Sequence, residues 1–189
     1  MNLPNKLSIL RIALIPVMVA LFYLTVIPYN YLWATLVFVI SALTDFLDGY
    51  IARKYNLITD FGKFLDPIAD KILVLSAFII MLTESRAFSG AYPELFGKLS
   101  GGIGVTLIIA RELTVSVLRM VAASKNRVLP AEKIGKVKTF LTDIAVILLF
   151  LALEYGVLFI PAIICYYLAV ILTVYSGVTY LVKNKDVLI

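Results

Sequence analysis

Residues 44–71 read TDFLDGYIARKYNLITDFGKFLDPIADK, and this stretch joins two apolar segments, residues 31–50 and 61–83. It carries four aspartates in two pairs, Asp45 with Asp48 and Asp66 with Asp70. At 100° per residue, the members of each pair share one face of a helix. The short turn between the two helices makes them antiparallel neighbours. The spacing therefore predicts that both pairs of carboxylates face one cleft.

The rest of the chain is strongly apolar. Of its 189 residues, 62% are hydrophobic and 15% are charged, against roughly 45–50% and about 25% in soluble domains. The mean hydropathy is +1.00. A soluble domain of this composition would expose large apolar patches. We therefore expect a single all-α polytopic membrane domain over residues 1–189.

Six apolar segments approach the ~20 residues that cross a bilayer core. They are residues 9–26, 31–50, 61–83, 101–121, 139–153 and 158–182. Residues 2–10 form either the start of the first crossing or a short N-terminal interfacial helix. Thr59 or Asp60 is the expected N-cap of the third segment. Residues 85–100 are expected to form an external loop, and Pro130 and Gly135 to interrupt a basic connection.

The distribution of charge predicts the orientation. Most of the 17 lysine and arginine residues lie in the N-terminal flank, the second-to-third connection, the fourth-to-fifth connection and the tail. With six crossings these four regions share one side, so both termini and the aspartate cleft are expected to be cytoplasmic. The net charge of +5 then indicates orientation and contact with anionic membrane lipids, and not nucleic-acid binding.

The residue types restrict the chemistry. The chain has no histidine and one cysteine, Cys165, which excludes a Ser-His-Asp triad, a histidine-ligated metal and an internal disulfide. Four unpaired carboxylates at membrane depth are costly, and their repulsion is relieved by divalent cations. Carboxylate oxygens suit two Mg²⁺ or Mn²⁺ ions, and a two-metal site suits displacement at phosphorus.

Smaller residues beside the aspartates fit the same chemistry. Gly49, Ala52 and Gly62 let a large polar ligand approach the backbone, and Arg53 is suited to hold a phosphate. Two alternatives to a two-metal site stay open. In the first, the aspartates are helix-end charges balanced by neighbouring basic residues. In the second, they are the ion sites of a cation transporter.

The pattern Asp45-x2-Asp48-Gly49-x2-Ala52-Arg53-x8-Gly62-x3-Asp66-x3-Asp70 resembles the signature of the CDP-alcohol phosphatidyltransferases. The resemblance implies six transmembrane helices around a cytoplasm-facing polar cavity. It implies that Asp45, Asp48, Asp66 and Asp70 hold two divalent cations, with Asp70 also the catalytic general base. It further implies that Gly49, Ala52, Arg53 and Gly62 line the site of the CDP group. The reaction implied is attack by an alcohol on a CDP-linked lipid, with release of CMP.

A second charged cluster gives information about the identity of the acceptor alcohol. Arg111, Glu112 and Arg119 lie in the fourth segment, and five basic residues follow in residues 124–139. Cations facing a metal cleft suggest an acceptor that carries a phosphate. Two alternatives remain: the basic loop reflects the positive-inside bias, and Glu112 forms a structural ion pair with one of the arginines.

The stretches LPNKLSILRIALIP, ARELTVSVLRM and IGKVKT extend the resemblance to members of the family that use CDP-diacylglycerol and sn-glycerol 3-phosphate. By resemblance, the acceptor phosphate is held by Arg111, Arg119, Lys136 and Lys138, and the nucleotide side is supported by Asn5, Ser8 and Arg11. A homodimer in the bacterial cytoplasmic membrane is also implied. Phosphatidylglycerol or an inositol phosphate remains an alternative acceptor.

Overall fold

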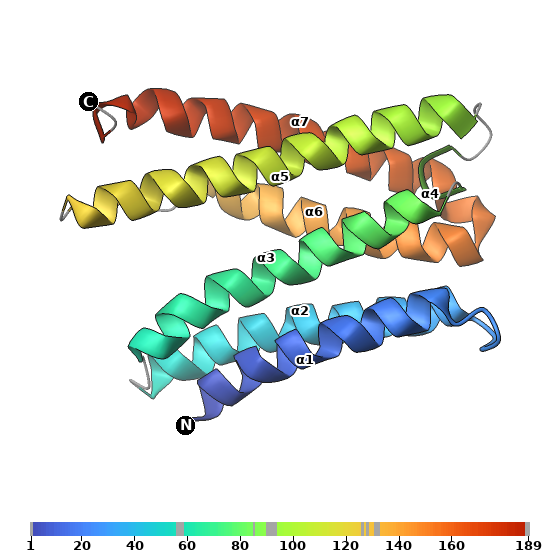
Figure 1. The fold of residues 1–189 in the computed structure, drawn as a ribbon, viewed down its shortest axis with the longest axis horizontal. Coiled ribbons are helices and arrows are strands. Elements are labelled where there is room, and N and C mark those ends of the chain that lie inside the picture. Colours follow the sequence, from blue (N-terminus) through green and yellow to red (C-terminus); the bar gives the residue numbers. More distant parts are fainter. Residues whose placement is uncertain are drawn as a thin grey trace.

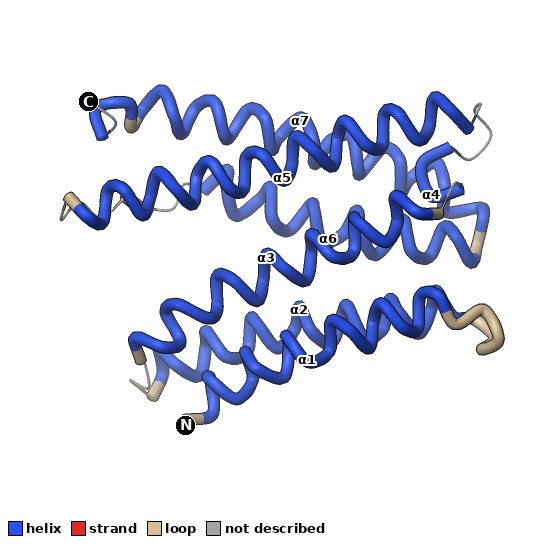
Figure 2. Tube along the Cα trace, viewed as in Figure 1, coloured by secondary structure: helices blue, strands red, loops and turns tan. Residues whose placement is uncertain are grey.

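A computed structural model shows a chain built from helices, with no strand among the described residues (Figure 2). It describes residues 2–55, 59–84, 86–89, 94–125, 127, 129–130 and 133–187, and at positions 46, 48, 50, 52, 53, 60, 63, 64, 94–96 and 133 it describes the backbone alone. The helices are α1 (Leu3–Tyr23), α2 (Asn30–Lys54), α3 (Asp60–Thr83), α4 (Arg86–Ser89), α5 (Glu94–Ser124), α6 (Lys133–Glu154) and α7 (Phe159–Lys183). Two 3₁₀ turns, η1 (Gly156–Leu158) and η2 (Lys185–Val187), flank α7. The expectation of an all-α chain is confirmed for these residues.

In the described part of the chain, six helices of 21 to 31 residues lie side by side and alternate in direction (Figure 1). Both chain termini therefore lie at the same end of the bundle. Helix α1 packs on α2 and α3, while α7 packs on α5 and α6. Contacts of α2 with α6, and of α3 with α5 and α6, join these two groups. The end that holds the termini also holds the end of α2 and the beginning of α3, which carry the aspartates.

The first helix is continuous from Leu3 to Tyr23, so a separate interfacial helix over residues 2–10 is wrong. Asn2 caps this helix by accepting a hydrogen bond from the Asn5 amide at 3.3 Å. The physical reason for the continuity is burial. Asn5 and Ser8 in its first turns are buried against the bundle, whereas a helix lying in the interface would present that face to lipid headgroups.

Two predicted helix boundaries are confirmed. Tyr29, in the turn between α1 and α2, adopts the left-handed conformation at φ 58°, which a helix does not continue through. The Asn30 side chain then donates a hydrogen bond to the Phe22 carbonyl at 2.6 Å, which satisfies one of the free carbonyls at the end of α1. At the start of α3, the Thr59 hydroxyl accepts from the Gly62 amide at 3.0 Å and is the N-cap.

Two expected connections are shorter than predicted. Helix α5 begins at Glu94, inside the expected loop of residues 85–100, and α6 begins at Lys133 and includes Gly135. Gly97, inside the expected loop, lies in α5, and a Cβ there would overlap the backbone of Ser89 in α4. A Cβ at Gly101 would lie 2.5 Å from the Phe88 ring. Glycine in these helices allows close approach of neighbouring elements and does not end the helix.

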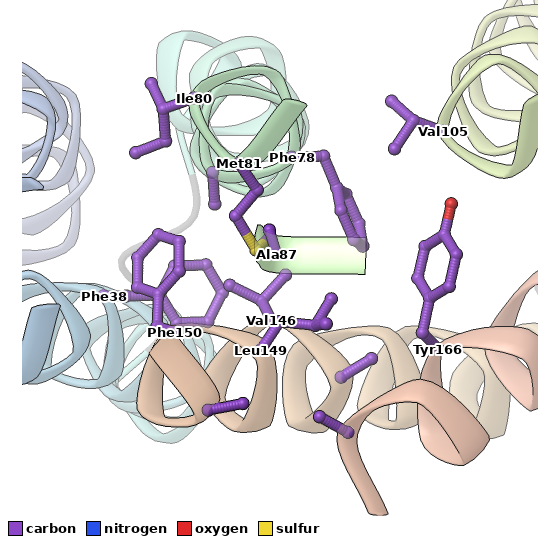
Figure 3. Packing of buried hydrophobic residues seen from close by; sticks show 14 of the residues in the cluster. Phe38, Phe78, Ile80, Met81, Ala87, Val105, Val146, Leu149, Phe150 and Tyr166 are labelled. Carbon is purple, nitrogen blue, oxygen red and sulfur yellow. The ribbon is translucent and has the colours of Figure 1, made fainter. Parts of the chain in front are cut away.

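A continuous apolar core joins the two helix groups. Phe38 of α2 and Phe150 of α6 place their ring centroids 6.4 Å apart, and Met81 of α3 packs beside them (Figure 3). Tyr166 of α7 is fully buried and donates a hydrogen bond to the Gly101 carbonyl at 2.8 Å. Its role is packing, because its hydroxyl is already paired inside the core.

Large apolar side chains also cover the outside of the bundle, among them Ile160, Ile171 and Val178 of α7. By length and hydropathy, two helices in the described residues are able to cross a membrane, Leu3–Tyr23 and Gly156–Lys183. The apolar part of α2, Asn30–Asp45, is shorter. It is interrupted where the aspartates begin, so the same residues that form the candidate site lower the hydropathy of the helix that carries them.

Candidate active site

A cleft of about 790 Å³ lies between the two helix groups, and its lining combines the two clusters noted in the sequence. Asp45 of α2 and Asp70 of α3 lie on one side. All four predicted phosphate-binding cations also line it, namely Arg111, Arg119, Lys136 and Lys138. Residues from four helices therefore meet at one cavity. We call the side formed by α1, α2 and α3 the aspartate wall and the side formed by α5 and α6 the cation wall.

Helix α1 supports the aspartate wall through Arg11, which is fully buried. Its Nη1 donates to Asp45 Oδ1 at 2.7 Å, and its Nε donates to the Ser41 carbonyl at 3.3 Å. The resemblance assigned Arg11 to the nucleotide side of the site, and in the structure its described contacts are with Asp45 and Ser41 of α2. It lies inside the bundle because an internal carboxylate is available to compensate its charge.

A second contact from α1 holds Asp66. The Ser8 hydroxyl is fully buried and donates to Asp66 Oδ1 at 2.5 Å. One turn earlier, Asn5 Oδ1 accepts a hydrogen bond from the Thr59 hydroxyl at 3.0 Å. The residues Asn5, Ser8 and Arg11 thus lie along one side of α1 and contact the elements that carry the aspartates.

Gly62 of α3 lies close to Asn5 of α1. A Cβ at this position would lie 2.9 Å from Asn5 Oδ1, 3.3 Å from Thr59 Oγ1 and 3.8 Å from Asp66 Oδ2. The first of these distances is too short for a carbon next to a fixed amide oxygen. A side chain here would displace Asn5 from its hydrogen bond with Thr59, so helix packing favours glycine at this position independently of any ligand.

Three predicted residues of the aspartate wall have side chains outside the described residues: Asp48, Ala52 and Arg53. Their backbone belongs to α2, and Gly49 lies one turn after Asp45 on the same helix. Among the described side chains, no three carboxylates or thiols come together closely enough to share a metal ion. The predicted four-aspartate set is therefore described only in part.

The chemistry of the described donors nevertheless fits a hard divalent cation. Arg11 donates to Oδ1 of Asp45, and Ser8 donates to Oδ1 of Asp66. The second oxygen of each carboxylate makes no hydrogen bond to any residue that the structure describes. Asp45 lines the cleft, whereas Asp66 is not among its lining residues. Carboxylate oxygens without a hydrogen-bond partner are the ligands that Mg²⁺ and Mn²⁺ prefer.

The cation wall is organised around Glu112. Lys138 is almost fully buried and forms an ion pair with Glu112 Oε1, and Arg111 Nη1 approaches the same oxygen at 3.1 Å. The alternative in which Glu112 pairs with one of the arginines is confirmed for Arg111. It does not hold for Arg119, whose Nε donates to the Tyr180 hydroxyl at 3.1 Å and whose guanidinium lies 5.3 Å from that ring.

Two residues in the cleft were missed in the sequence. Lys71 follows Asp70 in α3, lines the cleft and forms a hydrogen bond with the Ser116 hydroxyl. Asp143 of α6 lines the cleft with Asp70, and its charge interacts with those of Asp70 and Asp45. The available signal was an acidic residue inside the apolar segment 139–153, because ionisable residues in such segments are usually functional.

Comparisons with known proteins extend over nearly the whole chain. The profile described as CDP-alcohol phosphatidyltransferase matches residues 1–175. A Bacillus subtilis (strain 168) protein named CDP-diacylglycerol--glycerol-3-phosphate 3-phosphatidyltransferase is 39% identical over 200 residues, which cover 99% of this chain and 97% of the relative. A Rickettsia bellii protein of the same name is 40% identical over 182 residues, with 95% and 93% covered. A Mycobacterium tuberculosis (strain ATCC 25618 / H37Rv) protein named Probable phosphatidylglycerophosphate synthase is 38% identical over 190 residues, with 96% and 81% covered.

Proposed function

The chain belongs to the CDP-alcohol phosphatidyltransferase family, and we propose that it transfers the phosphatidyl group of CDP-diacylglycerol to sn-glycerol 3-phosphate. The products are phosphatidylglycerophosphate and CMP. The names of the relatives support this reaction. The structural observation that carries it is one cleft with Asp45 and Asp70 on one wall and four cations on the other. Such a cleft suits a reaction at phosphorus whose acceptor also bears a phosphate.

The proposal includes the position in the membrane. Six membrane-crossing helices would place both termini and the cleft on the cytoplasmic side of a bacterial membrane. This is supported by the six long helices in the described residues and by the two termini lying at one end of the bundle (Figure 1). The basic residues Lys136 and Lys138, at the start of α6, lie at that same end, as the positive-inside rule requires.

On the aspartate wall, Asp45, Asp48, Asp66 and Asp70 would hold two Mg²⁺ or Mn²⁺ ions. When bound, the two ions would stabilise the charge on the attacking and leaving oxygens at phosphorus. Arg11 and Ser8 keep Asp45 and Asp66 oriented by occupying one oxygen of each carboxylate. Preorganisation of this kind places ligand oxygens before the substrate arrives.

Asp70 would act as the general base. It would take the proton of the acceptor hydroxyl while that oxygen attacks the lipid-side phosphorus, and the bond from this phosphorus to the CMP oxygen would break. A base for this step must lie within reach of the acceptor. This role is supported by the position of Asp70 in the same cleft as the cations that would hold the acceptor. Gly49, Ala52 and Arg53 would contact the CDP group beside it.

The cation wall would bind the acceptor phosphate through Arg111, Arg119, Lys136 and Lys138. Glu112 neutralises part of this charge, because Lys138 and Arg111 both pair with it. One hydrogen-bond donor stays available for an anion, since the buried Nε of Arg111 has no hydrogen-bond partner among the described residues. Lys136 is exposed at the mouth of the cleft. A free phosphate oxygen would satisfy these donors.

An acceptor screen tests the proposal. The full chain, purified and supplied with CDP-diacylglycerol and Mg²⁺ or Mn²⁺, is offered sn-glycerol 3-phosphate, glycerol, an inositol phosphate or phosphatidylglycerol, and CMP release is measured. We expect glycerol 3-phosphate to be used far better than the others, because a site built for a polar group rejects analogues that lack it. Preferred use of phosphatidylglycerol or inositol phosphate would overturn the acceptor and leave the family unchanged.

A further inference from the structure

Asp143 is a carboxylate that the reaction described above does not use. It lies on α6, one turn after Thr139, and it is partly buried at the wall of the cleft. No hydrogen bond or ion pair joins it to any residue that the structure describes. A carboxylate withdrawn from water without a hydrogen-bond donor is costly. Its position therefore calls for a donor that the described part of the protein does not supply.

Beside Asp143 the cleft extends into a small chamber of about 30 Å³. Asp70, Asp143, Glu112 and Lys138 line both the chamber and the main cleft. The other lining residues include the apolar Val74, Leu75 and Ile108. A space of this volume holds two or three water-sized groups, since a water needs about 10–15 Å³. The chamber is therefore large enough for a hydroxyl group and too small for a phosphate or a nucleotide.

The charges around the chamber suit an acceptor that carries a phosphate at one end and hydroxyl groups at the other. Asp70, the general base proposed above, is at its edge and would face the hydroxyl that attacks. The cations of the cation wall would hold a phosphate further along the cleft. An acceptor fixed at these two points would place any hydroxyl on an intervening carbon near the chamber. A carboxylate there accepts a hydrogen bond from such a hydroxyl.

We propose that Asp143 is a specificity-determining residue that accepts a hydrogen bond from a second hydroxyl of the acceptor, on the carbon next to the one whose hydroxyl reacts. The site would thus select a phosphate ester that carries two adjacent hydroxyl groups, as glycerol 3-phosphate does. This inference rests on the proposed function, because it assigns a role within the same acceptor site. It goes further in naming the group that distinguishes this acceptor from simpler hydroxyalkyl phosphates.

The test compares two acceptors that differ only in the second hydroxyl. One is sn-glycerol 3-phosphate, and the other is 3-hydroxypropyl phosphate, which keeps the phosphate and the reacting hydroxyl. The full chain and its variants are assayed with CDP-diacylglycerol and Mg²⁺, and the ratio of the two kcat/KM values is measured. For the natural sequence we expect a ratio of about 10 to 100, the range of one hydrogen bond to a charged group.

Asp143→Leu should bring this ratio close to one, because the loss falls on the acceptor with two hydroxyls. Asp143→Asn should give an intermediate ratio, because its amide oxygen still accepts a hydrogen bond. The matched control is Glu154→Gln, which removes a carboxylate from the same helix roughly three turns away and should keep the natural ratio. The ratio is insensitive to the amount of folded protein, so a partly unfolded variant still tests the proposal.

Two results would overturn this inference alone. One is an unchanged ratio in both Asp143 variants with equal losses for the two acceptors, which would make Asp143 a structural residue or a metal ligand. The other is a natural protein that uses both acceptors equally well. Absence of CMP release from the natural protein with glycerol 3-phosphate, while another acceptor supports it, would instead overturn the proposed function.

Discussion

The aspartate wall and the cation wall of the cleft are held in place in different ways. On the aspartate wall, the supporting contacts come from α1, far away in the sequence, and the supporting residue Arg11 is fully buried. On the cation wall, Glu112 pairs with its own neighbour Arg111 and with Lys138, and the buried Arg111 Nε has no hydrogen-bond partner in the described part of the chain. The first wall is fixed by the fold, whereas the second keeps a donor available for an anion.

This difference has a physical basis. Carboxylates that are to hold cations must converge before the cations bind, and convergence of like charges needs support from outside the cluster. Cations that are to hold a phosphate need only avoid repelling one another until the phosphate arrives. One carboxylate, Glu112, reduces this repulsion because it is shared by Arg111 and Lys138.

The largest expected effect is loss of divalent cations. If the aspartate wall is built to hold two of them, a chelator in excess should abolish CMP release, and added Mg²⁺ or Mn²⁺ should restore it. Metal removal is verified by elemental analysis of the treated protein. Full activity of protein shown to be free of metal would contradict the proposed use of these aspartates.

The next largest effect is expected from Asp70→Asn, which keeps the shape of the side chain but cannot take up the acceptor proton. We expect turnover to fall by about 10²-fold or more, the lower end of general-base contributions. Binding of CDP-diacylglycerol, measured separately, should be largely retained. The exposed carboxylate Asp186 provides the control, since it does not line the cleft and Asp186→Asn removes a charge outside it. A rate near that of the natural protein would remove Asp70 from the mechanism.

A third prediction concerns the support of Asp45. Arg11→Met keeps an unbranched side chain of similar length but removes the donor to Asp45, whose side chain is 42% exposed. A hydrogen bond to a charged group contributes roughly 1.5–3 kcal/mol, and partial exposure of Asp45 reduces this to about 1–2 kcal/mol. The free energy of unfolding should fall by that amount when no divalent cation is present. Added Mg²⁺ should recover part of it.

The matched control for this variant is Arg127→Met. Arg127 pairs with Asp186 at 2.8 Å, almost the distance of the Arg11–Asp45 pair, but the side chains of Arg127 and Asp186 are both more than half exposed. Exposed pairs contribute about 0–1 kcal/mol. Thermal unfolding of the two variants in the same detergent compares them directly. Equal losses of stability would mean that the buried support of the aspartate wall has no special role.

The sequence predicted the elements of this site better than their contacts. Helical periodicity predicted the faces that Asp45 and Asp70 present to the cleft, and the structure also brings Arg111 and Arg119 to it. Periodicity gives the face of a helix but not the neighbour that the face meets. For this reason the contact of Arg11 in α1 with Asp45 in α2 could not be predicted from the sequence.

Asp143 was missed for a related reason. A single acidic residue in an apolar segment has no partner in a local pattern, and its neighbour Asp70 lies on another helix.

Two glycines led to the prediction of connections that are longer than those in the structure. Gly97 lies in the expected loop of residues 85–100 and Gly135 in the expected basic connection, yet both belong to helices. Glycine is a frequent loop signal, and the packing of α4 against Gly97 is not visible in the sequence.

A fourth prediction addresses the cation wall. Arg119→Ala should raise the KM for glycerol 3-phosphate by about tenfold, the effect of one weakened charge-assisted hydrogen bond. The KM for CDP-diacylglycerol should change little. The companion variant Arg53→Ala should show the reverse pattern. If Arg119→Ala affects neither substrate, its contact with Tyr180 is its whole role, and the acceptor phosphate depends on the other three cations.

The smallest expected effect separates the position of Arg119 from its charge. The Tyr180 hydroxyl accepts a hydrogen bond from Arg119 Nε at 3.1 Å, and the ring lies 5.3 Å from the guanidinium. Tyr180→Phe removes the hydroxyl and keeps the ring, so the cation–π contact should persist. Because the cation wall is expected to adjust when a phosphate binds, the KM for glycerol 3-phosphate should rise only about two- to threefold, well below the change in Arg119→Ala. Steady-state kinetics of both variants, with CDP-diacylglycerol saturating, measure the two changes side by side. A rise as large as that in Arg119→Ala would show that the tyrosine fixes this arginine as firmly as α1 fixes the aspartates, and the contrast between the two walls would then fail.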